Sequence, residues 1–191
     1  VLRDWAEAAD GRAAAVAADV ADLAKMRDLG CHVSDPFGAP DILVTAAGIN
    51  TREAAGDVTL EGWTSTINLN LAAPFFLAQE LAPAMKAKGW GRILNFASLQ
   101  TTRAFPGGLA YGASKGGIAQ LTRAMAEAWS PHGITANAIG PGFFKTELTG
   151  PVFEDPDRAA RNAAQTCIGC NGEMDDLDGP VLFFCSDASR Y

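Results

Sequence analysis

Short apolar runs alternate along this chain with longer stretches in which apolar side chains recur every three or four residues. Short runs bounded by polar or glycine positions are typical of strands that are covered on both faces. The longer periodic stretches are typical of helices with one apolar face. The alternation predicts strands over 12–18, 41–46, 92–97 and 134–139, and helices over 4–9, 21–29, 60–88, 109–130 and 173–185.

Glycine and proline mark where the two longest predicted helices end. Gly89 follows 60–88, and Pro131 and Gly133 follow 109–130. Proline cannot continue a helix, and glycine adopts the left-handed backbone angles that are common just after one. Strands that alternate with helices in this way predict an α/β fold, in which a doubly wound parallel sheet forms a single domain with helices on both faces.

Composition and charge narrow the class of protein. Of 191 residues, 48% are hydrophobic, which is enough for a sizeable core, and the formal net charge is −7. There is no cluster of Lys and Arg, so nucleic acid and anionic membranes are not expected as partners. No apolar run approaches the roughly 20 residues of a membrane span. The opening residues lack the basic-then-apolar pattern of a signal peptide, so we expect a cytoplasmic location by default.

Four cysteines raise the question of a metal or redox site. Two of them form a Cys-x-x-Cys pair, a spacing found in zinc sites and redox pairs. A zinc site would need two more ligands nearby, and the chain has only two histidines, His32 and His132. We therefore expect no metal site and free thiols in a reducing compartment. The cysteines are Cys31, Cys167, Cys170 and Cys185.

The strongest chemical signal is a tyrosine, a lysine and a serine. Tyr111 and Lys115 lie four residues apart in a predicted helix, so they share one face. A nearby ammonium stabilises a phenolate and lowers the pKa of the phenol from about 10 toward neutrality. Such a tyrosine takes or gives a proton at physiological pH. Ser98 follows the strand 92–97, at the carboxyl end where open parallel sheets bind their ligands.

Five motifs that follow one another along nearly the whole chain contain these residues. The motifs are Ala47-Gly48 after Asp41-Ile-Leu-Val44, Trp63 with Asn70-Leu71, Gly91-Arg-Ile-Leu-Asn-Phe-Ala-Ser98, Tyr111-Gly-Ala-Ser-Lys115, and Asn137-Ala-Ile-Gly-Pro141-Gly142 followed by Thr146. In this order and at these spacings they resemble the short-chain dehydrogenase/reductase family. The resemblance implies a Rossmann-like fold and NAD(P)-dependent transfer of a hydride between the nicotinamide and a secondary alcohol or ketone.

The resemblance also implies a role for each catalytic residue. Tyr111 would be the general acid and base, and Lys115 would lower its pKa and bind the nicotinamide ribose. Ser98 would hold the substrate oxygen. Asn70 would perturb its helix and bind a water that links the lysine to solvent. Asn68 is the alternative asparagine on that helix, and Asn70 is preferred because it falls seven residues after Trp63.

The cofactor implied is NAD or NADP. Asp19 and Val20 would meet the adenine, and Ala46, Ala47 and Gly48 would leave room for the adenosine ribose. Pro141 and Gly142 would turn the chain under the nicotinamide, and Thr146 would contact its carboxamide or a phosphate. The carboxylate of Asp19 has a second interpretation, as the N-cap of the predicted helix 21–29.

The chain departs from the family at several points; Cys170, for one, stands where the family often has an arginine. Thr45 and Ala46 stand where the family has two asparagines, which we expect to affect hydrogen bonds between strands more than catalysis. No glycine-rich turn precedes Asp19, and the family continues beyond Tyr191 with one more strand. We interpret 1–191 as one NAD(P)-binding domain without the first strand–turn–helix unit and the last strand. A rival hypothesis is a catalytically silent fragment or assembly subunit that cannot bind a dinucleotide.

The substrate and partners follow from the same resemblance. The segment 146–187 is similar to gluconate 5-dehydrogenases and related sugar or polyol dehydrogenases, and to 3-oxoacyl-carrier-protein reductases. We interpret the polar stretch 151–165 as a mobile substrate lid. The helices 60–88 and 109–130 would pair in a homodimer or tetramer. The residues expected to line the substrate pocket are Leu99, Gln100, Thr101, Arg103, Phe143, Phe144, Leu148 and Phe153.

Overall fold

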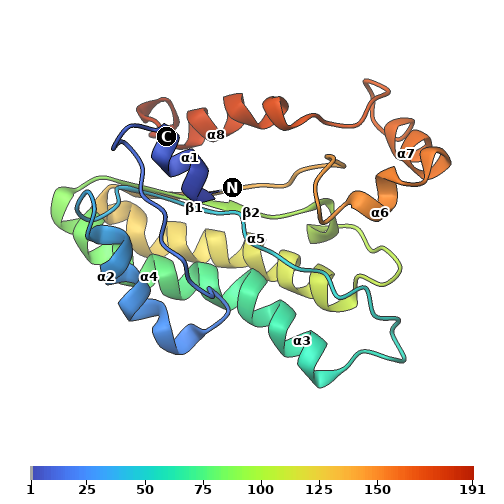
Figure 1. The fold of residues 1–191 in the computed structure, drawn as a ribbon, viewed down its shortest axis with the longest axis horizontal. Coiled ribbons are helices and arrows are strands. Elements are labelled where there is room, and N and C mark those ends of the chain that lie inside the picture. The colour runs from blue at the N-terminus through green and yellow to red at the C-terminus, as the bar shows by residue number, and fades with distance from the viewer. Residues whose placement is uncertain (1) are drawn as a thin grey trace.

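A three-stranded parallel sheet lies at the centre of the computed structural model, which describes residues 2–191 (Figure 1). Its strands are β1 (Ile42–Thr45), β2 (Gly91–Phe96) and β3 (Ile134–Ile139), in the order β1-β2-β3. The register places Thr45 opposite Asn95. Each crossover contains a helix, as parallel neighbours require. The three carboxyl ends therefore meet at one edge of the sheet.

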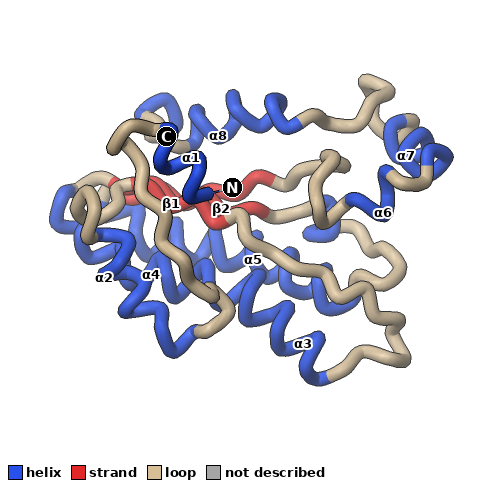
Figure 2. Tube along the Cα trace, in the orientation of Figure 1, coloured by secondary structure: helices blue, strands red, loops and turns tan. Residues whose placement is uncertain are grey.

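Helices cover both faces of the sheet, which confirms the doubly wound fold (Figure 2). The helices α2, α4 and α5 lie on one side with α3 packed against α5, and α1 and α8 lie on the other; α6 and α7 lie beyond the carboxyl ends of the strands. Their bounds are α1 Leu2–Ala8, α2 Met26–Ser34, α3 Leu60–Ile67, α4 Ala73–Lys88, α5 Leu109–Trp129, α6 Gly150–Phe153, α7 Pro156–Ala163 and α8 Asp178–Phe184. Within the described part of the chain, no helix is both long and apolar enough to cross a membrane.

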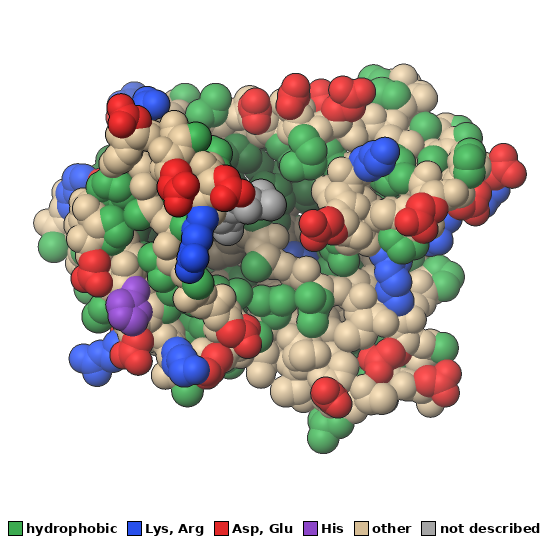
Figure 3. All heavy atoms as spheres, viewed as in Figure 1, with side chains coloured by type: hydrophobic (Ala, Val, Ile, Leu, Met, Phe, Trp, Pro, Cys, Tyr) green, Lys and Arg blue, Asp and Glu red, His purple; other side chains and the backbone are tan. Residues whose placement is uncertain are grey.

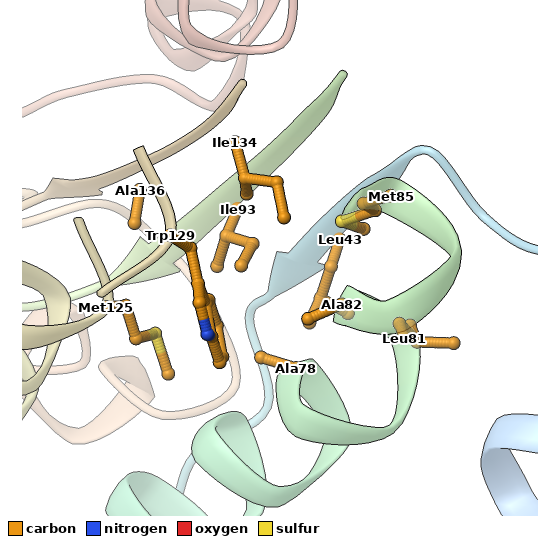
Figure 4. Close-up of a cluster of buried hydrophobic side chains, with 10 residues drawn as sticks. All are labelled: Leu43, Ala78, Leu81, Ala82, Met85, Ile93, Met125, Trp129, Ile134 and Ala136. Atoms are coloured by element: carbon orange, nitrogen blue, oxygen red, sulfur yellow. The ribbon is translucent and has the colours of Figure 1, made fainter. Parts of the chain in front are cut away.

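The hydrophobic core lies between the sheet and the helices α4 and α5. Ile93 and Ile134, on neighbouring strands, are almost fully buried and face Met85 of α4 and Trp129 of α5 (Figure 4). Burying a side chain of this size contributes roughly 1.5–3 kcal/mol. The full cluster is Leu43, Ala78, Leu81, Ala82, Met85, Ile93, Met125, Trp129, Ile134 and Ala136. The packing fixes α5, which carries Tyr111 and Lys115, against the sheet.

Two glycines end the long helices as the sequence predicts, and they also touch. Gly89 follows α4 with φ 71°, and Gly133 follows α5 and a 3-10 turn with φ 77°. Gly91 at the start of β2 donates its N–H to the Gly133 carbonyl at 3.2 Å. A Cβ on Gly133 would lie only 2.1 Å from the Gly89 carbonyl oxygen. Glycine is therefore required where the two strands enter the sheet.

Four predicted elements differ in the structure, one of them the helix predicted over 173–185, which is a 3-10 turn at Met174–Leu177 followed by α8. No strand forms over 12–18, because a strand needs a hydrogen-bonded neighbour and none of the described residues pairs with this segment. The helix predicted over 21–29 is shifted, with a 3-10 turn at Leu23–Lys25 followed by α2. The helix predicted over 60–88 is one rod, but a π-helical segment, Asn68–Ala72, joins α3 to α4.

Candidate active site

A cavity of about 540 Å³ opens at the carboxyl ends of the strands. On the face shown in Figure 3, the surface is hollowed near its centre, and hydrophobic side chains lie in the hollow. Most of the predicted site residues line the cavity, although they come from four separate stretches of the chain. These residues are Ala46, Gly48, Ser98, Tyr111, Lys115, Pro141, Gly142 and Thr146.

A second, smaller cavity of about 120 Å³ lies next to the first on the β1 side. Val20 and Ala47, both predicted to meet the adenosine part of the cofactor, line it among mainly apolar neighbours. Ala46 lines both cavities, so they are neighbours at the end of β1. Two neighbouring cavities, the smaller one mainly apolar, lie where open parallel sheets bind dinucleotides, at the carboxyl ends of the strands.

Tyr111 and Ser98 form the polar centre of the large cavity. Tyr111 lies in the first turn of α5 and is only 9% exposed. Burial raises the pKa of the Tyr111 phenol, while hydrogen bonding from Ser98 and the positive charge of Arg52 act in the opposite direction. The Ser98 hydroxyl also accepts from the Gln100 N–H at 3.1 Å, which fixes its direction. The structure thus brings a neutral phenol and a hydroxyl together in a partly dry site.

Lys115 lies one turn further along α5 and is 5% exposed. Its Nζ donates to the Phe96 carbonyl at 2.6 Å and lies 5.7 Å from the centre of the Tyr111 ring. Burial lowers the pKa of Lys115 to about 8. The prediction that the pKa of Tyr111 is lowered by Lys115 is wrong for this structure. The desolvation of a buried phenol outweighs the attraction of the charges around it, and the lysine is engaged by a backbone carbonyl.

Asn70 lies outside both cavities but is hydrogen-bonded to the helix that carries Tyr111. It belongs to the π-helical segment and is 1% exposed. Its Nδ2 donates to the Ser114 hydroxyl at 3.0 Å, and that hydroxyl donates to the Tyr111 carbonyl at 2.7 Å. A π-turn inside a helix is rare and is frequent at functional sites. The helix is therefore perturbed at Asn70, as predicted. The side chain of Asn70 is hydrogen-bonded to α5 through Ser114.

Asp19 does not line either cavity. Its carboxylate accepts the N–H of Ala21 at 2.9 Å, forming a local turn rather than a helix cap, because the helix begins later.

The departure from the family at Thr45 does not remove the side-chain hydrogen bond between the strands, contrary to expectation. The Thr45 hydroxyl donates to Asn95 Oδ1 at 2.7 Å, so a side-chain hydrogen bond still joins β1 to β2. Asn95 in turn donates to the Thr122 hydroxyl of α5.

Two arginines in the large cavity have no place in the sequence predictions. Arg52 lies four residues after Gly48, and its Nη2 donates to the Leu148 carbonyl at 2.5 Å. Its backbone is left-handed, with φ 57°, an uncommon conformation for a residue other than glycine. Arg158 comes from α7. The position of Arg52 in the loop after a strand is the one sequence signal that could have pointed to it.

The predicted substrate pocket is partly correct. Leu99, Gln100, Phe143, Phe144 and Leu148 line the large cavity. Thr101, Arg103 and Phe153 do not line it. The Thr101 hydroxyl donates to the Lys115 carbonyl, and Arg103 donates to Gln165. Val152, the neighbour of Phe153, lines the cavity in its place.

The four cysteines are free thiols, three of them exposed. In the described residues, no three His, Cys, Asp or Glu side chains gather where they could hold a metal ion.

The sequence of this chain is similar to those of known dehydrogenases and reductases. A family model described as enoyl-(acyl carrier protein) reductase matches residues 2–191. The gluconate 5-dehydrogenase of Gluconobacter oxydans is 32% identical over 185 residues, which are 97% of this chain and 72% of that enzyme. The 2-dehydro-3-deoxy-D-gluconate 5-dehydrogenase of Escherichia coli K12 is 39% identical over 81% of this chain and 62% of that enzyme.

A solved structure gives the same result for the fold. The gluconate 5-dehydrogenase of Burkholderia cenocepacia, determined in complex with NADP and tartrate, superposes with a TM-score of 0.86 at 35% identity. The match covers 91% of this chain and 68% of that one. The chain therefore shares its parallel sheet and its helices with proteins of known architecture, over about two thirds of their length.

Proposed function

The chain belongs to the short-chain dehydrogenase/reductase family of NAD(P)-dependent oxidoreductases, and from this premise we propose that it interconverts a secondary alcohol and a ketone on a sugar acid. The observation that carries the proposal is that Ser98, Tyr111 and Lys115 line one cavity at the carboxyl ends of the strands. A serine hydroxyl beside a buried phenol is suited to hold one oxygen atom and to exchange its proton.

Each residue has a proposed role in that exchange. Ser98 binds the oxygen of the substrate, and Tyr111 gives its phenolic proton to that oxygen in reduction or takes the hydroxyl proton in oxidation. When bound, the nicotinamide supplies the hydride acceptor in oxidation and the hydride donor in reduction. Lys115 places a positive charge at the rear of the site. Asn70 is a positioning residue that acts through Ser114 on α5.

We propose that the two neighbouring cavities bind NAD or NADP. Val20 and Ala47 would lie against the adenosine half, with Asp19 reaching the adenine only if its bond to Ala21 is released. Five more of the residues predicted to contact the cofactor line the large cavity, where they would lie along its other half. These residues are Ala46, Gly48, Pro141, Gly142 and Thr146.

A sugar acid is the substrate class that we favour over a 3-oxoacyl thioester. The relatives compared above are named as dehydrogenases of gluconate and of a deoxy-gluconate, and the Burkholderia enzyme was solved with tartrate, a hydroxy acid. The cavity supports this assignment, since arginines and amide side chains line it together with phenylalanines. Hydroxyl and carboxylate groups need such donors when they leave water.

We also propose a homo-oligomer in the cytoplasm. Leu60, Trp63, Phe76 and Leu109 are large hydrophobic residues that remain exposed on α3, α4 and α5, on the elements predicted to pair in a dimer or tetramer. Free thiols suit a reducing compartment. The mass in solution, measured by light scattering, should be a multiple of the chain mass, and a monomer at micromolar concentration would contradict the pairing.

The test of the proposed activity uses Tyr111→Phe, which removes the proton and keeps the ring. We expect the wild-type protein to form NAD(P)H from gluconate, and the variant to lose about a thousandfold in rate. Quenching of tryptophan fluorescence by NADPH should be equal in both proteins. Retained turnover in the variant would contradict the role of Tyr111. A wild-type protein that binds neither NADH nor NADPH would support a catalytically silent subunit.

A further inference from the structure

The charges that line the large cavity have the opposite sign to the chain as a whole. The chain carries a formal net charge of −7, and acidic side chains follow the rim of the molecule along α8 (Figure 3). In the cavity, by contrast, Arg52, Lys115 and Arg158 are accompanied by a single carboxylate, Glu147. A cleft of one sign of charge concentrates ligands of the other sign. The cavity is therefore suited to an anion.

Two of these three cations are already engaged by the backbone. Lys115 donates to the Phe96 carbonyl, and Arg52 donates to the Leu148 carbonyl. Arg158 differs, because its guanidinium has no hydrogen bond and no ion pair with any described residue; only its backbone N–H is bonded, to Asp155 at 3.0 Å. An arginine carries five N–H donors in a planar fork that matches a carboxylate. Arg158 is thus the cavity cation that is free to receive one.

Hydrogen bonds around α7 attach Arg158 to the wall of the cavity. The neighbouring residue, Ala159, accepts from Asn171 Nδ2 at 3.1 Å. Gly172, which follows Asn171 in the chain, donates its N–H to the Phe143 carbonyl at 2.9 Å. Gly172 also pairs with Phe144 in an isolated β-bridge. Phe143 and Phe144 both line the cavity. The helix that carries Arg158 is therefore bonded, through two adjacent residues, to the segment that forms the substrate wall.

We propose that Arg158 binds the carboxylate of the substrate while Tyr111 acts on a hydroxyl further along the same carbon chain. This inference rests on the proposed function, and it names the residue that selects an acid over a neutral polyol. A group that binds the carboxylate must lie away from Tyr111, because several carbons separate the carboxylate from the reacting hydroxyl. Arg158 fulfils this condition, since it enters the cavity from α7 rather than from α5 or the sheet.

The test compares two arginines on one helix and two ligands on one carbon skeleton. Arg158→Gln removes the proposed contact, and Arg161→Gln is the matched control, since Arg161 is exposed on α7 and does not line the cavity. Gluconate carries the carboxylate, and glucitol replaces it with a hydroxymethyl group. We expect Arg158→Gln to lower kcat/KM for gluconate about ten- to hundredfold and to leave glucitol within about twofold. Arg161→Gln should leave both values within about twofold.

A binding experiment separates this inference from the proposed activity. Gluconate with NADPH forms no product, because both are already reduced, so thermal stabilisation by the pair measures binding alone. Weaker stabilisation of Arg158→Gln by gluconate supports the inference even if the wild-type protein turns over neither ligand. Equal losses for gluconate and glucitol, or unchanged gluconate binding in Arg158→Gln, would overturn it. Absence of gluconate binding by the wild-type protein would overturn it as well.

Discussion

The side chain of Asn70 binds both polar groups of Ile49. Its Oδ1 accepts the Ile49 N–H at 2.9 Å, and its Nδ2 donates to the Ile49 carbonyl at 2.9 Å. The Asn70 amide therefore gives Ile49, in the loop beyond β1, the two hydrogen bonds that a neighbouring strand would otherwise provide. The same Nδ2 reaches Ser114, so one buried amide joins the loop that borders the cavity to the helix of Tyr111.

Asn70→Ala should lower both stability and turnover, whereas Asn68→Ala should lower neither by much. The first change leaves the half-buried N–H and carbonyl of Ile49 without their partner, and each lost hydrogen bond costs about 0.5–1.5 kcal/mol. Asn68 lies in the same π-segment, is partly exposed, and has no side-chain hydrogen bond within the described residues. Urea unfolding and steady-state rates of both variants test this. Equal losses in the two variants would point to the π-turn itself rather than to the Asn70 amide.

The buried charge of Lys115 should make stability rise with pH in the alkaline range. The pKa of Lys115 falls from 10.5 to about 8 in the folded chain, so between those values the unfolded chain binds more protons. The free energy of unfolding of the wild-type protein should therefore rise through this window. Lys115→Met has no charge to bury, so its free energy of unfolding should not rise in this way. The difference in free energy of unfolding between the variant and the wild-type protein should therefore change by on the order of 3 kcal/mol across the window, in favour of the wild-type protein.

Urea midpoints measured from neutral pH to about pH 10 check this prediction. The raised pKa of Tyr111 acts in the opposite direction only above the usual pKa of a free tyrosine, because there the unfolded phenol loses its proton first. Parallel stability profiles for the wild-type protein and Lys115→Met would contradict a lowered lysine pKa.

Arg52 should shift the ascending limb of the pH profile for oxidation. Its positive charge lowers the pKa of the Tyr111 phenol, so Arg52→Gln should raise that pKa and move the rise of kcat/KM to higher pH. Arg52→Lys keeps the charge and should keep the profile, although it loses the fork that reaches the Leu148 carbonyl. Initial rates measured over a range of pH decide the matter. The same shift in both variants would exclude a charge effect.

Gly133→Ala should destabilise the fold by about 2–4 kcal/mol. The new Cβ would overlap the Gly89 carbonyl oxygen, and φ is 77° at this position. Gly179→Ala in α8 is the control, because a Cβ there meets no atom within 4 Å and φ is not positive. We expect the control to be neutral or stabilised by up to about 1 kcal/mol. Thermal unfolding of both variants measures the difference, and a tolerant Gly133 would contradict the close approach of the two turns.

Local sequence determined most of the elements and the family. The strands 41–46, 92–97 and 134–139, the two long helices and their glycine ends are confirmed, because periodicity and helix stops act over a few residues. Tyr111 and Lys115 share a helix face for the same reason. The family, its fold and its use of NAD(P) follow from five ordered motifs, and the comparisons bear them out. The roles of the individual site residues stay predictions.

Tertiary structure decided everything that depends on a distant partner. The segment 12–18 is an apolar run that predicts a strand, but no strand lies beside it to pair with, so it forms none. The pKa of Tyr111 rises because packing removes water from the phenol, an effect that the spacing to Lys115 cannot reveal. Arg52 and Arg158 share one cavity only because α7 folds back over the carboxyl ends of the strands. Burial and long-range contact are properties of the whole chain, and no short stretch of sequence encodes them.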